Sequence, residues 1–139
     1  MSTQEIIEEK ISYIEKRLSV AKKYQHYSKE TIEKDEMIRS VVERELYVLA
    51  QAVIDLAEAV VALKKLRKPT TMREAFDILG EADILPKEFL GDFSKIVGFR
   101  NSLAHDYRDL QIEVIYDVLQ VKLDQVEEFI NYIEQNLEL

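Results

Sequence analysis

Apolar residues recur every three or four positions along most of the chain, which is the period of an amphipathic α-helix. The first such stripe comprises Ile6, Ile7, Ile11, Ile14, Leu18 and Ala21. Ser2 and Glu5 have the spacing of a capping box, in which the side chain at a helix start accepts from a backbone N–H one turn on. We therefore predict a first helix from Ser2 to about Tyr24, followed by a polar connection over residues 26–35.

A second and longer stripe predicts a helix from about Asp35 to Leu66. Its apolar positions are Ile38, Val41, Val42, Leu49, Ala52, Val53, Leu56, Ala57 and Val60. So many apolar and small positions are typical of a helix that is buried on more than one side. The cations within residues 64–68 suit the negative end of a helix dipole, and Pro69 is expected to stop the helix.

Turn and cap residues divide the rest of the chain into three helical segments. Thr71 and Glu74 form another capping box that opens a short helix over 72–79, and we expect Gly80 to close it in the left-handed conformation. Pro86 fits the first turn of a fourth helix, and Asp109 is the expected cap of the last one. The apolar face of the fourth helix comprises Phe89, Leu90, Phe93, Ile96 and Val97, and that of the last helix comprises Ile112, Ile115, Val118, Leu119, Leu123, Val126, Phe129, Ile130 and Ile133.

These segments contain no convincing strand, so the predicted fold class is all-α. The simplest arrangement that buries all the stripes is an antiparallel up-and-down helical bundle of four main helices and one short helix. The chain has 139 residues and only three glycines and two prolines. We therefore expect one domain over residues 1–139, built from long helices and few turns.

Composition excludes several kinds of site. The chain has no cysteine, which rules out a disulfide framework, a thiolate metal site and a cysteine nucleophile. We find no phosphate-binding glycine loop, dinucleotide fingerprint or cluster of metal ligands, so we predict no metal and no cofactor. No apolar run approaches the roughly 18–20 residues of a membrane helix, and the N-terminus lacks signal-peptide features. We expect a cytoplasmic protein without membrane contact.

The net charge of −8 disfavours non-specific binding to nucleic acid, so any RNA contact requires a local basic patch. The candidate RNA-binding residues are Lys64, Lys65, Arg67, Lys68 and Arg108. For Lys64, Lys65, Arg67 and Lys68, which lie at the end of the second helix, the alternative role as helix-end cations is at least as common. His26 lies in a polar connection between tyrosines, and we assign it no function.

The segment from Gly98 to Tyr107 holds the candidate chemistry. Arginine presents a planar fork of donors that matches a phosphate, and histidine titrates near neutral pH. Together they suffice for RNA cleavage without a metal: His105 would activate the ribose 2′-hydroxyl, and Arg100 would stabilise the charge that develops on the phosphate oxygens. Asn101 and Tyr107 are the other polar members of this segment.

Arg100 and His105 are five positions apart, which on a continuous helix means about 140° of rotation and about 7.5 Å of rise. They converge on one substrate if the helix ends between them, if the long arginine reaches over, or if a twofold dimer brings in a second copy. An arginine and a histidine near a helix end are more often a cap and a solvated cation, and a tyrosine such as Tyr107 is more often a packed ring.

The segment Arg100-Asn101-Ser102-Leu103-Ala104-His105-Asp106-Tyr107 resembles the Arg-x4-His-x-Tyr signature of HEPN domains, in the branch called HepT. The resemblance extends over about residues 37–133. It includes the segments Gln51-Ala52-Val53-Ile54-Asp55-Leu56-Ala57, Arg73-Glu74-Ala75-Phe76-Asp77-Ile78-Leu79 and Ile96-Val97-Gly98-Phe99-Arg100-Asn101. Two positions depart from the family pattern, since Ser102 replaces a bulky aliphatic residue and Ala104 a frequent valine.

The resemblance implies a homodimeric, metal-independent endoribonuclease that is the toxin of a type VII-like toxin–antitoxin pair. Arg100, His105 and Asn101 map onto the catalytic positions. The partner in this family is a small nucleotidyltransferase-like antitoxin called MntA, which can transfer AMP to the motif tyrosine, here Tyr107. The alternatives are a non-catalytic HEPN module that binds a nucleotide or a protein partner, and a purely structural helical dimer.

Overall fold

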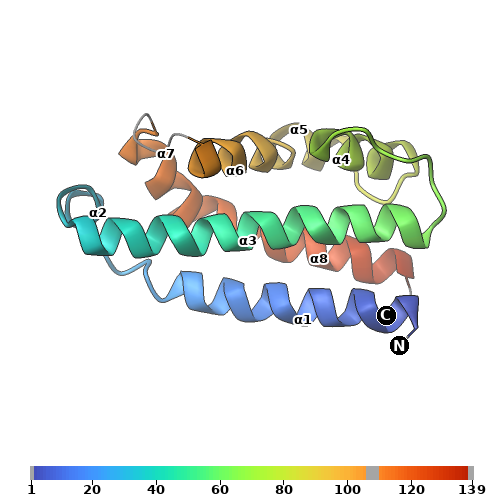
Figure 1. The fold of residues 1–139 in the computed structure, drawn as a ribbon, viewed down its shortest axis with the longest axis horizontal. Helices are drawn as coiled ribbons and strands as arrows, with labels where there is room; N and C mark the ends of the chain where they lie inside the picture. Colours follow the sequence, from blue (N-terminus) through green and yellow to red (C-terminus); the bar gives the residue numbers. More distant parts are fainter. Residues whose placement is uncertain (1, 106–109, 138–139) are drawn as a thin grey trace.

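The computed structural model describes residues 2–105 and 110–137, and these form helices and no strand (Figure 1). The elements are α1 (Thr3–Lys22), α2 (Lys29–Lys34), α3 (Glu36–Leu63), α4 (Met72–Glu81), α5 (Lys87–Phe93), α6 (Ile96–His105), α7 (Ile112–Asp117), the π-helical turn η2 (Val118–Lys122) and α8 (Leu123–Leu137). The predicted all-α fold class is confirmed.

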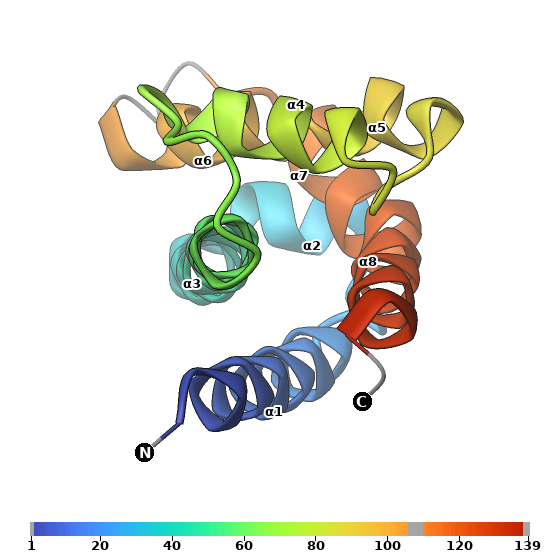
Figure 2. The same ribbon diagram turned by 90° about the vertical axis from the view of Figure 1, so that its right-hand side faces the viewer.

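The helices form four passes along the long axis, and successive passes run in opposite directions (Figure 1). The passes are α1, then α3, then α4 to α6 together, then α7 to α8. The end-on view shows α4, α5 and α6 as one layer, with α3, α1 and α8 beneath it (Figure 2). Helix α3 packs against α1, α2, α4 and α6, which makes it the central helix of the up-and-down bundle.

The buried face of α3 explains its central place. Its buried side chains are Val42, Leu46, Leu49, Ala50, Ala52, Val53, Ile54, Leu56, Ala57, Val60 and Val61. By length and mean hydropathy this helix could also cross a membrane, so the expectation that no apolar stretch approaches that length was wrong. More than half of its most apolar stretch is buried inside the bundle, as expected for a core helix.

The predicted caps at Ser2 and Thr71 are confirmed, since their side-chain oxygens accept from the N–H groups of Glu5 and Glu74 at 3.1 Å. The connection over residues 26–35 was wrong in part, because it contains the short helix α2. Ser28 caps α2, and Ile32 anchors it by being fully buried. One buried apolar residue in a polar segment is too weak a pattern to predict this helix.

Gly80 does not close α4 in the left-handed conformation. It lies within the helix, and the left-handed residue is Asp83, with φ 60°. A Cβ atom built on Gly80 would lie 2.4 Å from Leu90 Cδ1, so the glycine permits close packing of the α5 segment instead of a turn. Helix α3 likewise ends at Leu63, before Pro69, and Lys65 takes φ 55°.

The predicted fourth helix is divided into α5 and α6, which are separated at the buried Ser94. Pro86 precedes α5 as its cap residue. The last helix begins at Ile112 without a side-chain cap hydrogen bond from Gln111. The proposed cap Asp109 lies outside the described residues. The last helix also contains the π-helical turn η2, which periodicity alone does not reveal.

Candidate functional site

Three acceptors fix the guanidinium of Arg100, which is half-buried on α6. Its Nε donates to Gln51 Oε1 at 2.7 Å, Nη1 to Asn101 Oδ1 at 3.0 Å, and Nη2 to the Tyr47 hydroxyl at 3.4 Å. The Cζ atom of Arg100 also lies 5.5 Å from the centroid of the Tyr47 ring. Tyr47 and Gln51 are four residues apart on α3, so they present their side chains on the same face of that helix.

Asn101 contributes to this arrangement, since its amide oxygen accepts a hydrogen bond from Nη1 of its neighbour Arg100. Gln51 and Tyr47 were not identified as site residues from the sequence. The signal that could have found them is chemical: both carry polar groups on a helix whose remaining positions are mostly apolar. Their pairing with Arg100 spans about fifty positions and required the packing of α6 on α3.

His105 is the last residue of α6, and its side chain is exposed. The helix is therefore continuous from Arg100 to His105 and does not end between them. On one helix the two side chains leave the axis in directions about 140° apart. The remaining routes to convergence are the reach of the arginine within one chain and a second copy of the protein in a dimer.

The proposed RNA-binding cations of residues 64–68 lie at the far end of α3 from the motif (Figure 1). Lys64 is thirteen positions beyond Gln51, or about 20 Å along the helix axis. Arg67 is bound by two carboxylates, through Nε and Nη2 to Glu81 at 3.0 and 2.7 Å and through Nη1 to Glu74 at 2.9 Å. The hydrogen bonds that Arg67 donates to Glu81 raise the pKa of Arg67.

The Lys64 ammonium group donates to the Asn136 carbonyl at 3.3 Å, while Lys65 and Lys68 are exposed. Within one chain, the structure does not bring this cluster to Arg100. The two other predicted residues of the site, Tyr107 and Arg108, lie outside the described residues.

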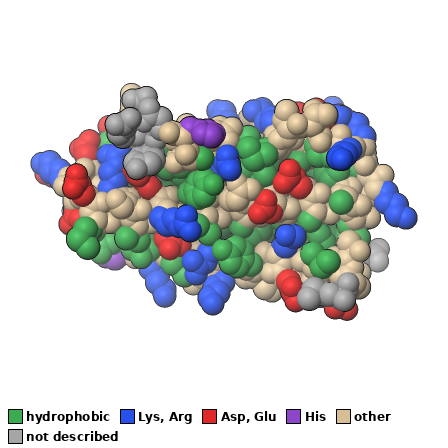
Figure 3. Space-filling view, in the orientation of Figure 1, with side chains coloured by type: hydrophobic (Ala, Val, Ile, Leu, Met, Phe, Trp, Pro, Cys, Tyr) green, Lys and Arg blue, Asp and Glu red, His purple; other side chains and the backbone are tan. Residues whose placement is uncertain are grey.

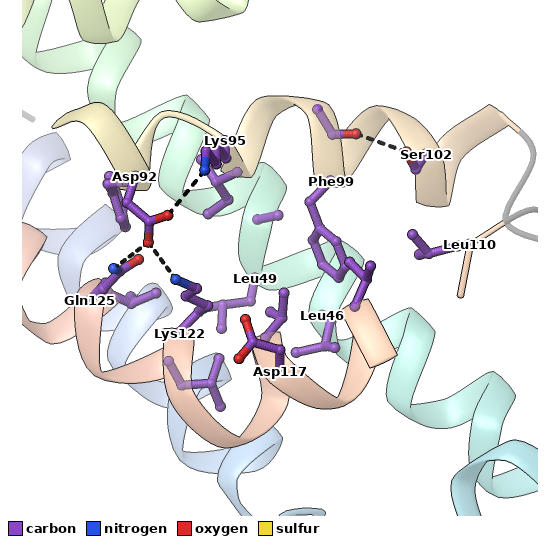
Figure 4. Close-up of a pocket in the computed structure, with 18 of the residues that line it drawn as sticks. Leu46, Leu49, Asp92, Lys95, Phe99, Ser102, Leu110, Asp117, Lys122 and Gln125 are labelled. Atoms are coloured by element: carbon purple, nitrogen blue, oxygen red, sulfur yellow. Dashed lines mark hydrogen bonds and ion pairs between the residues drawn. The ribbon is translucent and has the colours of Figure 1, made fainter. Parts of the chain in front are cut away.

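A cavity of about 540 Å³ lies on the side of α6 that carries Gly98, Phe99 and Ser102. Apolar side chains from α3, α6 and α7 to α8 line most of it, and the carboxylate of Asp92 lies at one end (Figure 4). Asp92 accepts from Lys122 and, at 2.8 Å, from Gln125, while Lys95 lies 3.5 Å away.

These donors, Lys122 first, lower the pKa of Asp92 to about 2. Besides this cluster, one further cation, Arg73, and one further carboxylate, Asp117, line the cavity. This cluster was not predicted from the sequence, because Asp92 and Lys122 are thirty positions apart.

A second pocket, of about 340 Å³, lies beside the motif, between α3 and the last turns of α6. It is lined by Ser40, Glu43, Arg44, Tyr47, Leu103 and Ala104. Tyr47 belongs both to this pocket and to the set that holds Arg100. In the part of the chain that the structure describes, no three acidic or histidine side chains gather to form a metal site.

Comparison with known proteins identifies the family. The family model described as Ribonuclease HepT-like matches residues 7–133. The mRNA nuclease HepT of Shewanella oneidensis is 30% identical over 84 residues, which cover 60% of this chain and 63% of that protein. The tRNA nuclease HepT of Aphanizomenon flos-aquae is 28% identical over 132 residues, which cover 95% of this chain and 90% of that protein.

Solved structures agree with this assignment. A tri-AMPylated HEPN toxin of Shewanella oneidensis in complex with the MNT antitoxin superposes with a TM-score of 0.86 at 25% identity, covering 97% of this chain and 99% of that one. The cytosolic protein YutE of Bacillus subtilis shares the fold, with a TM-score of 0.82 at 16% identity, covering 97% of this chain and 90% of that one. With the family model spanning nearly the whole chain, the protein belongs to the HepT-like ribonucleases, a family of RNA-cleaving enzymes.

Proposed function

We propose that this protein is the toxin of a toxin–antitoxin pair and cleaves RNA without a metal ion, using Arg100 and His105 at a cleft between two identical subunits. The observation that carries the proposal is the fixed guanidinium of Arg100. Three of its N–H groups are used by Gln51, Asn101 and Tyr47, and the others remain for a phosphate. A guanidinium held in advance stabilises developing charge without reorganising at the moment of reaction.

The reaction follows from the chemistry of these groups. His105 accepts the proton of a ribose 2′-hydroxyl, and the 2′-oxygen attacks the adjacent phosphorus. The bond from phosphorus to the 5′-oxygen breaks, and that oxygen takes a proton from an imidazolium. The products are a 2′,3′-cyclic phosphate and a 5′-hydroxyl, while Arg100 stabilises the negative charge on the phosphate oxygens.

A cleavage assay tests this proposal. Purified protein in EDTA should cut RNA and leave 2′,3′-cyclic phosphate ends, and it should leave DNA of the same sequence intact. Arg100→Ala and His105→Ala should each abolish cleavage. A His105→Ala protein that cuts at the parental rate would contradict the mechanism, and nucleotide binding without any cleavage would favour a non-catalytic binding module.

The shared cleft has its own test. The continuous helix α6 separates Arg100 from His105, so a site that takes each from a different subunit satisfies the geometry. Mixing Arg100→Ala protein with His105→Ala protein, each inactive alone, should restore cleavage, because one cleft of the mixed dimer then holds both groups. If the mixture stays inactive after subunit exchange has been verified, a site with one residue from each subunit is wrong.

Regulation is proposed to act through Tyr107, two positions beyond His105. An MntA-like nucleotidyltransferase would transfer AMP to its hydroxyl, which adds bulk and negative charge beside the imidazole and repels the RNA phosphate. Incubation with the antitoxin and ATP should raise the intact mass of the protein by whole AMP units and abolish cleavage. The Tyr107→Phe variant should gain no mass at this position and should keep its activity.

A further inference from the structure

The pocket of about 340 Å³ beside the motif is built on one stripe of α3. Ser40, Arg44, Tyr47 and Gln51 follow one another at steps of four, three and four residues, so they share one face of the helix. The later two, Tyr47 and Gln51, hold Arg100. The earlier two, Ser40 and Arg44, line the pocket together with Tyr47.

Arg44 supplies the positive charge among the side chains that line this pocket. Among the described residues, the pocket is lined by one carboxylate, that of Glu43, which Arg39 binds at 2.8 Å. Arg44 is exposed, and none of the ion pairs or hydrogen bonds that join described residues involves its guanidinium. Figure 3 shows basic side chains over α3 and over the left-hand end of α1, with acidic side chains among them. An exposed arginine of this kind supplies local positive charge, which RNA binding by a protein with a net charge of −8 requires.

We propose that this pocket is a subsite for the nucleotide next to the cleaved bond, with Arg44 and Ser40 binding its phosphate. This inference rests on the proposed ribonuclease function. Arg44 lies one helical turn, about 5 Å along the axis, before Tyr47, whose hydroxyl accepts from Arg100. An RNA strand whose scissile phosphate meets Arg100 therefore passes Arg44 with a neighbouring phosphate.

The other walls of the pocket suit a ribose and a base. The Tyr47 ring lies on one side, and Leu103 and Ala104 of α6 lie on the other. The volume falls within the range of roughly 300–1,000 Å³ that small-ligand pockets occupy, which is enough for one nucleotide. Arg44 is thus a substrate-binding residue that contributes affinity, whereas Arg100 and His105 perform the chemistry.

The test separates binding from cleavage by working in the His105→Ala background. Binding of a fluorescent single-stranded RNA is measured by anisotropy at several salt concentrations, with and without Arg44→Ala. We expect the second substitution to weaken binding at low salt about fivefold or more and to reduce the slope of log affinity against log salt by roughly 0.7, the value for one phosphate contact on a single strand.

Two further variants complete the design. Arg73→Ala removes the same charge from an exposed position on α4 and should leave both the affinity and the slope unchanged. Arg44→Lys keeps the charge and should retain most of the slope. If Arg44→Ala and Arg73→Ala behave alike, the subsite is wrong.

Cleavage kinetics of proteins that retain His105 distinguish a failure of the subsite from a failure of the ribonuclease function. Arg44→Ala should raise KM about as much as it weakens binding and should change kcat by less than about twofold. Active wild-type protein whose KM and RNA affinity do not depend on Arg44 would overturn the subsite and leave the ribonuclease function standing. An inactive wild-type protein that binds RNA through Arg44 would overturn the ribonuclease function and would support only RNA binding at this pocket.

Discussion

At the scale of single residues, Arg100 is positioned by side chains from two helices. Gln51 and Tyr47 approach it from α3, and Asn101 approaches from its own helix. Each acceptor meets a different nitrogen of the guanidinium, so the planar fork is held at three points. The orientation of the guanidinium depends on these three directed hydrogen bonds, and a side chain that carries only the same charge does not reproduce them.

Arg100→Lys tests this dependence. The ammonium group keeps the charge but cannot meet three acceptors in fixed directions, so we expect kcat to fall about 100-fold or more, as when a positioned donor to developing charge is lost. The variant should unfold within about 2 °C of the parent, because the side chain is only half-buried. Cleavage kinetics and thermal unfolding measure the two effects, and a lysine variant with parental kcat would contradict the geometric argument.

At the scale of elements, the end of α4 is set by tertiary packing and not by the local preference of glycine for a turn. Helix α4 continues through Gly80 and ends at Glu81, and the left-handed turn falls on Asp83, which is exposed. Glycine has no Cβ atom and adopts such a φ without a steric clash, whereas aspartate adopts it at a steric cost. The chain therefore places a glycine where α5 packs closely and leaves the turn to an aspartate.

We expect Asp83→Gly to stabilise the protein by up to about 1 kcal/mol, because the substitution removes the steric strain of a left-handed backbone at this position. Thermal unfolding should show a rise in Tm of about 2–4 °C for such a change in a chain of this size. Asp77→Gly is the matched control: it lies within α4, where glycine is unfavourable, and should lower Tm. A decrease for both variants would contradict the assignment of the turn.

The ion cluster at Asp92 joins α5 to η2 and α8. Lys122 and Gln125 lower the pKa of Asp92 from 3.8 to about 2. A lowered carboxyl pKa stabilises the folded state above the unfolded-state value, and this contribution is lost as the pH falls through the folded-state value. Asp92 is partly exposed, so salt screens part of the effect.

Urea unfolding between pH 6 and pH 2 checks this pH dependence. The difference in free energy of unfolding between the wild type and Asp92→Asn should be largest at pH 6, should shrink below about pH 4 and should be smallest near pH 2. Added salt should reduce this difference in free energy of unfolding at every pH. A difference that stays constant over this range would show that the asparagine disturbs packing and not charge.

At the scale of the whole molecule, α3 is the helix around which the other passes are arranged. Its side chains contact α1, α2, α4 and α6, and it supplies the two residues that orient Arg100. Stability and the site therefore depend on the same element. A change in the α3 core should affect every pass of the bundle at once.

Ile54→Ala should lower the free energy of unfolding by about 2–5 kcal/mol, because Ile54 is fully buried and the surrounding core cannot close the cavity completely. Val41→Ala on the same helix removes a side chain that is 40% exposed and should cost about 1 kcal/mol or less. Chemical denaturation gives both values, and equal losses would show that the core is not centred on α3.

Periodicity and caps were sufficient to predict the all-α class, the long passes and the helix starts at Ser2 and Thr71, because these depend on residues within one or two turns of each other. The motif residues Arg100, Asn101 and His105 were singled out by their chemistry and by the resemblance to HEPN domains, and their catalytic roles stay a prediction. Three-dimensional packing was needed to reveal α2, the break at Ser94, the left-handed Asp83 and the partners of Arg100. The partners of Arg100 lie about fifty positions away in the sequence, and a local pattern carries no information about which distant side chains will meet.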